Sequence, residues 1–579
     1  MSAATWMAGS GPAGISARAW LAVLLLAVAA LFPGITAIPV MDRDEGRYLQ
    51  ASKQMLETGD YVDIRLQDEP RYGYPVGTYW VKAGSAALFG GTAAPAWAYR
   101  LPSFVAGLAA VLGTAWLGAR IGGPAAGVGA GLLLAVSLVV AVESRVGRSD
   151  ALLLATVVVT QAALWRITKL TAERPAFWGA PALFWAAHGV GIMVKGPIIT
   201  LVVALTIAAL CLWNRDRSLL RRLRILPGLA MTAAIVLPWL LAISVRVGPA
   251  YLQEALGSSM MGKVAKGDRA HGAPPGYHLV ALFVAFWPGA LLAGAAAALA
   301  WTRRREADIR FLVCWLVPTF LVFEAVATKL PHYTMPTYPA LAILAGLVLA
   351  TGFRPEGRWR WAHWVVVGLF VFVTIALSLV PLVGSILYSG MSSLPEFIQG
   401  NDTGPHSGDL TFGIAIYAAL VGLIALGFGF RVLDKMSIKR VTLFTVSVSV
   451  FYAINFQALF PRLEDLWPSR TLERIVDSLN GCEVKSIAIT GYAEPSAVFY
   501  LGTDTELGEP RYALDLLRRD PACGIAVTTE ADRQTFLAAA SALGAEVREV
   551  GWFSAFNYTR GKRVQMTIYV SKSSRLHRN

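Results

Sequence analysis

Charged residues, cysteines and histidines are all scarce in this sequence. Only 15% of its 579 residues are Asp, Glu, Lys or Arg, whereas 55% are hydrophobic. An average globular chain carries about 25% charged residues, so a water-soluble enzyme, a disordered chain and a collagen-like fibre are excluded. Four cysteines are too few for a disulfide framework, and their spacing contains no zinc-binding motif.

Long apolar runs recur along the chain from about residue 17 to residue 460. A hydrocarbon core about 30 Å thick requires roughly 20 apolar residues per helix, and about thirteen stretches approach that length. They lie near 17–38, 101–118, 124–142, 150–167, 177–194, 197–213, 225–245, 277–300, 309–328, 337–352, 362–384, 411–430 and 441–460. The sequence therefore predicts a polytopic α-helical membrane protein with about 13 transmembrane helices.

Positive charge is distributed unevenly among the loops, although the formal net charge is +14. If the N-terminus is cytoplasmic and the spans alternate, the basic loops 215–224, 303–310, 354–360 and 431–440 all fall on the cytoplasmic side. The opposite loop 385–410 contains neither Lys nor Arg. Because Lys and Arg accumulate in cytoplasmic loops, the charge indicates membrane topology, and no nucleic-acid partner is expected.

This topology places a first loop (39–100), a second loop near 246–276 and the tail from 461 outside the cytoplasm. We expect a transmembrane catalytic domain over 1–460 and a small α/β domain over 461–579. The expected strands are VKSIAIT, SAVFYLG, CGIAVTT, EVREVGW and VQMTIYV, with a helix near 530–543. Cys482 and Cys523 each precede a predicted strand, and both a disulfide and two free thiols remain open.

The first outer loop opens with the charged sequence DRDEGRY directly after a membrane helix. Asp44 in this motif has two interpretations: acidic residues at a membrane boundary are often functional, and an aspartate can also cap a helix that follows it. The stretch Glu45–Glu57 has the spacing of an amphipathic helix lying along the interface.

Four further polar clusters fall on the same side as Asp44 in this topology. They are ESRVGRSDALL, MVKGPII, GDRAHGAPPGYH and KLPHYTMPTYPA, and they contain Asp150, Lys195, Arg269, His271, Lys329, Tyr333 and Tyr338. Asp150 could instead cap its helix, and Lys195 could be an interface anchor. Cations and tyrosine hydroxyls hold phosphates, and a carboxylate can accept a proton from an attacking hydroxyl. The clusters therefore indicate a reaction on a lipid-linked phosphate.

The order of these motifs resembles the GT-C superfamily of polyprenyl-phosphate-sugar-dependent glycosyltransferases. Within it, the chain resembles the bacterial lipid A aminoarabinose transferases and the protein O-mannosyltransferases. The matching sequences are DRDEGRY, SRVGRSDALL, VKGP, HGAPPGYH followed by FWPG, KLPHYTMPTYP and GYAEPSAVFYLG. The resemblance covers nearly the whole length, in order. It implies a GT-C fold in the bacterial inner membrane, surrounded by membrane lipids.

The resemblance also implies an activity and the residues that carry it. The expected reaction is inverting transfer of one sugar from a polyprenyl (undecaprenyl) phosphate carrier to a periplasmic acceptor, lipid A or another envelope glycolipid. Asp44 matches the catalytic carboxylate and Asp150 a second required acid. The positions expected to face the donor phosphate are Arg47, Tyr48, Lys195, Arg269, Lys329 and Tyr333 or Tyr338. His271 resembles a histidine that helps to bind a metal ion in some relatives.

One stretch departs from the family pattern. Relatives carry a Glu-Lys or Lys-Lys pair before a proline, whereas this chain has Gly73 and Tyr74 before Pro75. Tyr74 can donate a hydrogen bond but cannot neutralise a phosphate. The difference indicates either an altered donor or neutralisation by Arg71, and it leaves a divalent metal only as an open alternative.

A polytopic transporter or lipid flippase is the alternative from another functional class. Transporters often contain paired repeats with broken helices and charges near the bilayer midplane. No internal repeat is recognisable in this sequence, and its charged clusters gather towards one membrane face. The pattern therefore favours a transferase.

Overall fold

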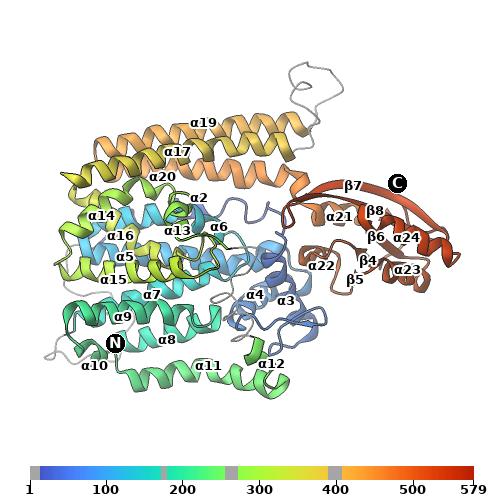
Figure 1. Cartoon of the computed structure of the whole chain (residues 1–579), viewed down its shortest axis with the longest axis horizontal. Helices are drawn as coiled ribbons and strands as arrows, with labels where there is room; N and C mark the ends of the chain where they lie inside the picture. Colours follow the sequence, from blue (N-terminus) through green and yellow to red (C-terminus); the bar gives the residue numbers. More distant parts are fainter. Residues whose placement is uncertain (1–13, 171–178, 255–271, 389–406, 579) are drawn as a thin grey trace.

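The computed structural model describes residues 14–170, 179–254, 272–388 and 407–578. It consists of a large helical bundle with a smaller α/β part extending from one end (Figure 1). The helices of the bundle are α2 (Ala17–Leu31), α5 (Ala96–Ala135), α6 (Leu138–Glu143), α7 (Asp150–Thr168), α8 (Gly179–Lys195), α9 (Ile198–Asn214), α10 (Ser218–Arg222), α11 (Ile225–Val247), α12 (Ala250–Leu252), α13 (Tyr277–Ala285), α14 (Ala293–Thr302), α15 (Ala307–Ala325), α16 (Tyr338–Thr351), α17 (Arg358–Tyr388), α19 (Ser407–Asp434) and α20 (Ile438–Tyr452).

Every predicted apolar stretch contributes to one or more of these helices. Two predicted stretches share α5, which bends at Gly123, where the backbone has φ of 85° directly before Pro124. Within the described residues, six helices are long and apolar enough to cross a membrane, or seven if the bent segment from α13 to α14 counts as one span. The polytopic helical membrane fold is thus confirmed, while the count of thirteen spans stays a prediction.

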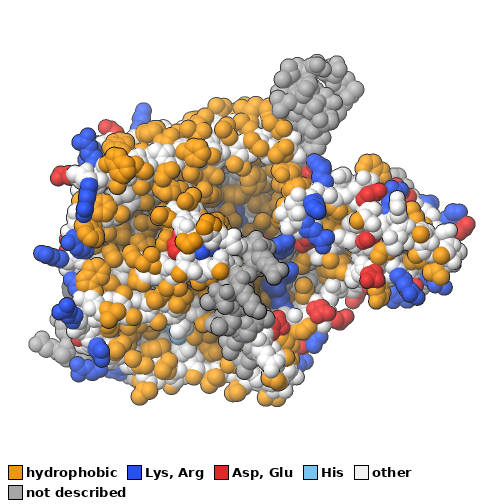
Figure 2. All heavy atoms as spheres, viewed as in Figure 1, with side chains coloured by type: hydrophobic (Ala, Val, Ile, Leu, Met, Phe, Trp, Pro, Cys, Tyr) orange, Lys and Arg blue, Asp and Glu red, His pale blue; other side chains and the backbone are white. Residues whose placement is uncertain are grey.

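The surface of the bundle agrees with a membrane environment. Apolar side chains cover its flank, and Lys and Arg side chains gather at the end opposite the α/β part (Figure 2). Only 22% of the most apolar window of α11 and 28% of that of α17 is buried inside the protein. Apolar helix faces that are not covered by protein suit contact with lipid acyl chains.

The segment between α2 and α5 forms α3 (Asp44–Thr58), the short strands β1 (Arg65–Leu66) and β2 (Glu69–Pro70), α4 (Gly77–Leu88) and a turn of 3-10 helix, η1 (Gly91–Ala93). The predicted helix over Glu45–Glu57 is confirmed as α3. Capping by Asp44 was a wrong alternative, because the helix already includes Asp44 and the residue before it, Arg43, makes no side-chain cap. Figure 1 shows α3 and α4 at the end of the bundle that meets the α/β part.

The α/β part is built around a five-stranded sheet of order β5-β4-β6-β8-β7. Its strands are β4 (Ser486–Thr490), β5 (Glu506–Gly508), β6 (Gly524–Thr529), β7 (Val547–Asn557) and β8 (Lys562–Ser571). β4 pairs in parallel with β5 and β6, while β8 is antiparallel to β6 and β7. Its helices are α21 (Pro468–Asp477), α22 (Pro495–Leu501), α23 (Pro510–Arg519) and α24 (Glu530–Ala542), and β3 (Leu479–Asn480) pairs with β9 (His577–Arg578).

In the α/β part, one sequence prediction is wrong and one open question is answered. The expected strand SAVFYLG is wrong, because these residues lie mainly in the helix α22. Pro495 occupies the first turn of that helix, where a proline ring fits and no backbone N–H is required. The open question about the cysteines is also answered: Cys482 and Cys523 form a disulfide, with 5.9 Å between their Cα atoms.

Candidate active site

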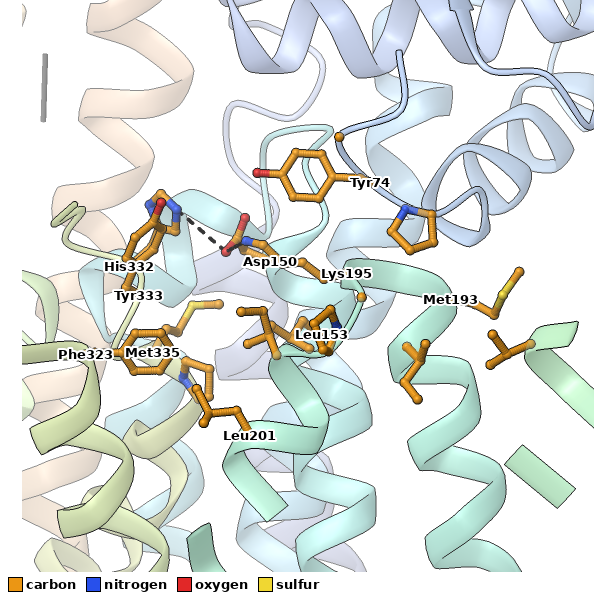
Figure 3. Close-up of a pocket in the computed structure, with 18 of the residues that line it drawn as sticks. Tyr74, Asp150, Leu153, Met193, Lys195, Leu201, Phe323, His332, Tyr333 and Met335 are labelled. Carbon is orange, nitrogen blue, oxygen red and sulfur yellow. Dashed lines mark hydrogen bonds and ion pairs between the residues drawn. The ribbon is translucent and has the colours of Figure 1, made fainter. Parts of the chain in front are cut away.

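A cavity of about 400 Å³ lies between the helices near the α/β end of the bundle. Its walls are largely apolar and come from α7, α8, α9, α11, α15 and the segment before α16. At its polar end, the lining residues are Tyr74, Asp150, Lys195, His332 and Tyr333. Figure 3 shows these five side chains close together on one side of the apolar lining.

Asp150 and Lys195 form the central ion pair of this polar end. The Lys195 Nζ lies 2.5 Å from Asp150 Oδ1, and both side chains are at least 90% buried. Asp150 opens α7, where the positive end of the helix dipole favours an acid. Lys195 ends α8, and Gly196 with φ of 68° allows the chain to turn directly into α9. The sharp turn therefore explains why a lysine at this point faces inward.

His332 completes the polar end from the loop between α15 and α16. Its Nε2 lies 3.8 Å from Asp150 Oδ1, and its Nδ1 lies 3.9 Å from Glu143 Oε1. Burial lowers the pKa of His332 to about 3, so the imidazole is neutral at physiological pH. Glu143 is occupied by an ion pair with Arg148. Among the described residues that line the cavity, Lys195 therefore supplies the positive charge.

A cluster of tyrosines and one arginine lies beside this ion pair. The Tyr48 ring packs against the rings of Tyr74 and Tyr79, with centroids 5.9 and 5.3 Å apart. The Arg71 Nε donates to the Tyr79 hydroxyl at 2.9 Å, and its guanidinium carbon lies 5.3 Å from the Tyr48 centroid. The Tyr48 hydroxyl lies 3.4 Å from Ser149 Oγ. Tyr48, Arg71 and Tyr74 therefore sit next to the Asp150 loop.

Lys82 is a further buried cation beside Tyr48, and the sequence did not point to it. Its Nζ donates to Thr78 Oγ1 at 2.8 Å and to the Arg148 carbonyl at 3.2 Å, and it lies 5.4 Å from the Tyr48 centroid. Burial lowers the pKa of Lys82 to about 7. A single lysine in the apolar stretch YWVKAGSAAL is ordinarily an interface anchor, so nothing local pointed to it. His332 belongs to the cluster KLPHYTMPTYPA, in which nothing local distinguishes it as a site residue.

Asp44 and Arg47 lie nearer to solvent than the ion pair. The Arg47 Nη1 is 3.7 Å from Asp44 Oδ1, and the two side chains are 41% and 50% exposed. Asp44 does not line the cavity, but it is close enough to act on it electrostatically. Burial raises the pKa of Tyr333 to about 12, and the negative charge of Asp44 acts in the same direction. Asp44 is therefore an accessible carboxylate beside the polar end.

Two of the predicted phosphate positions, Lys329 and Tyr338, are not part of this arrangement. Lys329 donates to the carbonyls of Glu324 and Val326 at 2.9 and 2.5 Å and so closes the end of α15. Tyr338 is completely buried in the apolar core, with its hydroxyl 3.1 Å from Thr334 Oγ1. Neither residue lines the cavity, so the structure gives no geometric support to a phosphate contact. Arg269 and His271 lie outside the described residues.

The described residues contain no candidate metal site. They contain no group of three or more His, Cys, Asp or Glu side chains arranged to hold a metal ion. The acids at the polar end are paired with cations instead.

Comparisons with known proteins agree on a glycosyltransferase family. Residues 73–241 match the family described as dolichyl-phosphate-mannose-protein mannosyltransferase. The undecaprenyl phosphate-alpha-4-amino-4-deoxy-L-arabinose arabinosyl transferase of Pseudomonas aeruginosa is 31% identical over 314 residues, which cover 54% of this chain and 56% of that protein. The protein of the same name from Pectobacterium atrosepticum is 28% identical over 378 residues, 63% of this chain and 66% of the relative. The chain thus matches little more than half the length of the first of these relatives.

Solved structures extend the likeness to the whole fold. ArnT from Cupriavidus metallidurans, crystallised with undecaprenyl phosphate, superimposes with a TM-score of 0.73 at 21% identity, covering 96% of this chain and 99% of ArnT. The oligosaccharyltransferase of Archaeoglobus fulgidus gives a TM-score of 0.50 at 12% identity over 92% of this chain and 69% of that protein. The resemblance to GT-C glycosyltransferases, and to the aminoarabinose transferases among them, is confirmed, and the chain has the GT-C fold.

Proposed function

We propose that this protein is an inverting membrane glycosyltransferase that moves one sugar from an undecaprenyl-phosphate-type carrier to lipid A or another envelope glycolipid. The observation that carries the proposal is the cavity, which joins apolar walls to a polar end containing a cation, tyrosines and acids. A polyprenyl chain suits the walls, and its phosphate suits the polar end. The names of the matched arabinosyl transferases support the same donor class.

The proposed orientation places the reaction on the periplasmic side of a bacterial inner membrane, with the N-terminus in the cytoplasm. The basic end of the bundle then faces the cytoplasm, in agreement with the positive-inside rule. The α/β part lies at the opposite end of the bundle (Figure 1), and the loop before Asp44 bonds to it through Asp42 and Arg43. The proposed division is a transmembrane catalytic domain over 1–460 and a periplasmic α/β domain over 461–579.

The donor phosphate is held in this proposal by Lys195, Tyr333 and Tyr74 at the cavity wall, with Arg71 beside them. Among the described residues, Arg71 uses only its Nε, towards Tyr79, so its two terminal nitrogens can donate to phosphate oxygens in the fork geometry that suits an anion. Gly73 and Tyr74 stand where relatives carry a charged pair. In this proposal Arg71 supplies the positive charge that a tyrosine cannot. Tyr48 packs beside Tyr74 and Arg71, and Arg47 pairs with Asp44.

The transfer step follows from the positions of the two acids. Asp44 accepts the proton of the acceptor hydroxyl while that oxygen attacks the anomeric carbon. The bond from this carbon to the phosphate oxygen breaks on the opposite face, and its electron pair leaves with the polyprenyl phosphate, which inverts the anomeric configuration. Lys195 and Arg71 stabilise the charge that develops on the departing phosphate. Asp150 is bound to Lys195 at 2.5 Å and so acts by holding that cation in place.

A deletion strain tests the proposal through its envelope lipids. The strain is complemented with the wild-type gene, with Asp44→Asn, and with Asp68→Asn as a matched control, because Asp68 is an exposed aspartate of the same loop. Mass spectrometry is expected to show a glycolipid that differs by one sugar and is restored by the wild type and Asp68→Asn only. Restoration by Asp44→Asn would remove Asp44 as the base. A glycolipid profile that is identical in all strains would contradict the proposed acceptor class.

A further inference from the structure

Asp42 lies two residues before Asp44, yet its contacts belong to the α/β part. Its side chain is buried, and its carboxylate accepts hydrogen bonds from Ser496 Oγ and from the Tyr492 hydroxyl, the latter at 3.4 Å. Ser469 Oγ lies 2.9 Å from that Tyr492 hydroxyl and 2.7 Å from Ser496 Oγ. One acid of the first loop is therefore surrounded by three hydroxyl groups of the α/β part.

Asp42 bonds to residues near the carboxyl end of β4, a part of the sheet that binds ligands in many α/β folds. β4 is the central strand of the parallel group, and its two neighbours β5 and β6 lie on opposite sides. The chain leaves β4 towards β5 on one side and leaves β6 towards β7 on the other, so these connections diverge at the carboxyl ends of β4 and β6, where open α/β sheets ordinarily bind ligands. Tyr492 and Ser496 both follow β4 directly. Here Asp42, from the first loop, bonds to the segment that follows β4.

The backbone around Asp42 is held from the same side. The Asp42 N–H donates to the Tyr558 hydroxyl at 2.5 Å, and Arg43 Nη2 donates to the Thr559 carbonyl at 2.6 Å. Arg43 has φ of 58° and ψ of −110°, a conformation that residues other than glycine rarely adopt. Such a conformation persists only where the surroundings impose it. The contact to Tyr558 holds the backbone directly before Arg43, and the contact to Thr559 holds the Arg43 side chain. Arg43 in turn directly precedes Asp44.

The first turn of α3 is also fixed against α22. A Cβ atom added at Gly46 would lie 2.7 Å from the Ser496 backbone nitrogen, so the two helices touch through their backbones. The Val40 N–H donates to the Tyr500 hydroxyl at 2.7 Å. The segment from Val40 to Gly46 is thus held at several points by residues near the carboxyl end of β4 and by the turn after β7.

We propose that the α/β domain is a positioning element for the transfer reaction: through Asp42 and Tyr558 it sets the turn at Arg43 that presents Asp44 and Arg47 to the polar end of the cavity. The inference rests on the proposed function. Asp42 and Tyr558 do not themselves line the cavity. Their effect on catalysis passes through the position of Asp44, because a small displacement of a catalytic group lowers the rate strongly.

The test uses the full-length protein and separates positioning from bracing. Tyr558→Phe removes the acceptor of the Asp42 N–H and keeps the ring, and Asp42→Ala removes the carboxylate. Thr503→Val is the control, because Thr503 bonds Gln50 and Glu57 further along α3, at the same interface but away from Arg43. Steady-state kcat, KM for the donor and the thermal midpoint are measured for each. We expect Tyr558→Phe to lower kcat about 10- to 100-fold, with KM and midpoint unchanged, and Asp42→Ala to lower kcat at least as much.

Each other outcome has a definite meaning. Wild-type kcat in both Tyr558→Phe and Asp42→Ala would overturn the inference, as would an effect confined to KM. A loss of kcat that merely follows the thermal midpoint, and appears equally in Thr503→Val, would show that the domain only braces the loop. A wild-type protein that transfers no sugar contradicts the proposed function itself, an outcome distinct from active wild type with unaffected variants.

Discussion

Glu45 and Arg100 form a buried ion pair through two contacts, with Arg100 Nε 2.8 Å from Glu45 Oε1 and Nη2 3.0 Å from Oε2. The same carboxylate accepts the N–H of Gly147 at 2.7 Å and of Met41 at 2.9 Å. Burial alone would raise the pKa of Glu45, but Arg100 and these two N–H groups lower it overall. One carboxylate thus joins the loop of Asp44 to the loop that leads to Asp150.

Replacement of Glu45 by Gln is expected to destabilise the protein by about 3–5 kcal/mol, because Arg100 is then left buried without its counter-charge. The double variant Glu45→Gln with Arg100→Gln is expected to recover part of the lost stability. Thermal unfolding in detergent measures both, with the exposed Glu69→Gln as control. A midpoint for Glu45→Gln equal to that of Glu69→Gln would show that the pair does not stabilise the fold.

Lys195→Ala is expected to lower sugar transfer about 100-fold or more, since one charged donor to the developing phosphate is removed and Asp150 loses its nearest cation. Lys195→Arg keeps the charge and is expected to retain intermediate activity. Lys169→Ala is the matched control, because Lys169 pairs with Asp308 at the other end of α7. Turnover per folded protein is compared among the three. Equal turnover in Lys195→Ala and Lys169→Ala would exclude Lys195 from the reaction.

Removal of the Cys482–Cys523 disulfide is expected to destabilise the α/β domain by about 2–5 kcal/mol, because the bond closes a sequence separation of 41 residues and restricts the unfolded chain. The variant Cys482→Ser with Cys523→Ser is compared with Cys211→Ser, which alters a free thiol. Limited proteolysis is expected to cleave the α/β domain faster in the first variant only. The same rate in both would mean that the disulfide adds no stability under native conditions.

Local patterns predicted much of this protein, and contacts distant in sequence account for what they missed. Apolar length alone located the long helices of the bundle. Charge among apolar runs singled out Asp150 and Lys195, which the fold brings into contact. Tyr333 and Tyr338 were not separable by sequence, since both belong to KLPHYTMPTYPA. The first lies in the loop at the cavity, whereas the second opens α16 and packs into the core. Lys82 could not be recognised, because its burial depends on Tyr48 and the loop of Arg148.

Helix α22 is a case in which the local sequence did not predict the secondary structure. Its sequence is a short continuous run of apolar and aromatic residues, which also suits a strand, and only the proline in its first turn argued otherwise. Its role is likewise not local, because Ser496 and Tyr500 act on the segment around Asp42, more than 400 positions away in the chain.

The buried carboxyl of Asp42 predicts a pH dependence of the contact between the first loop and the α/β part. Burial raises its pKa from 3.8 to about 7, and the charge of Glu494 adds to this, while the hydrogen bonds from Ser496 and Tyr492 oppose it. The other polar or charged groups around it are Ser469, Tyr558, Arg43 and Glu45.

The folded protein therefore keeps the Asp42 proton up to about pH 7, whereas the unfolded chain releases it near pH 3.8. Since the folded state binds more protons in this window, the contribution of Asp42 to stability is full below pH 3.8, falls as the pH rises to about 7 and stays constant above it. Asp42→Asn lacks this titration. The thermal midpoint of the wild type is expected to decline relative to that of Asp42→Asn between about pH 4 and pH 7. A midpoint difference that is constant over this range, or that changes in the opposite direction, would show that Asp42 is ionised in the folded protein and bound to its hydroxyl partners as a carboxylate.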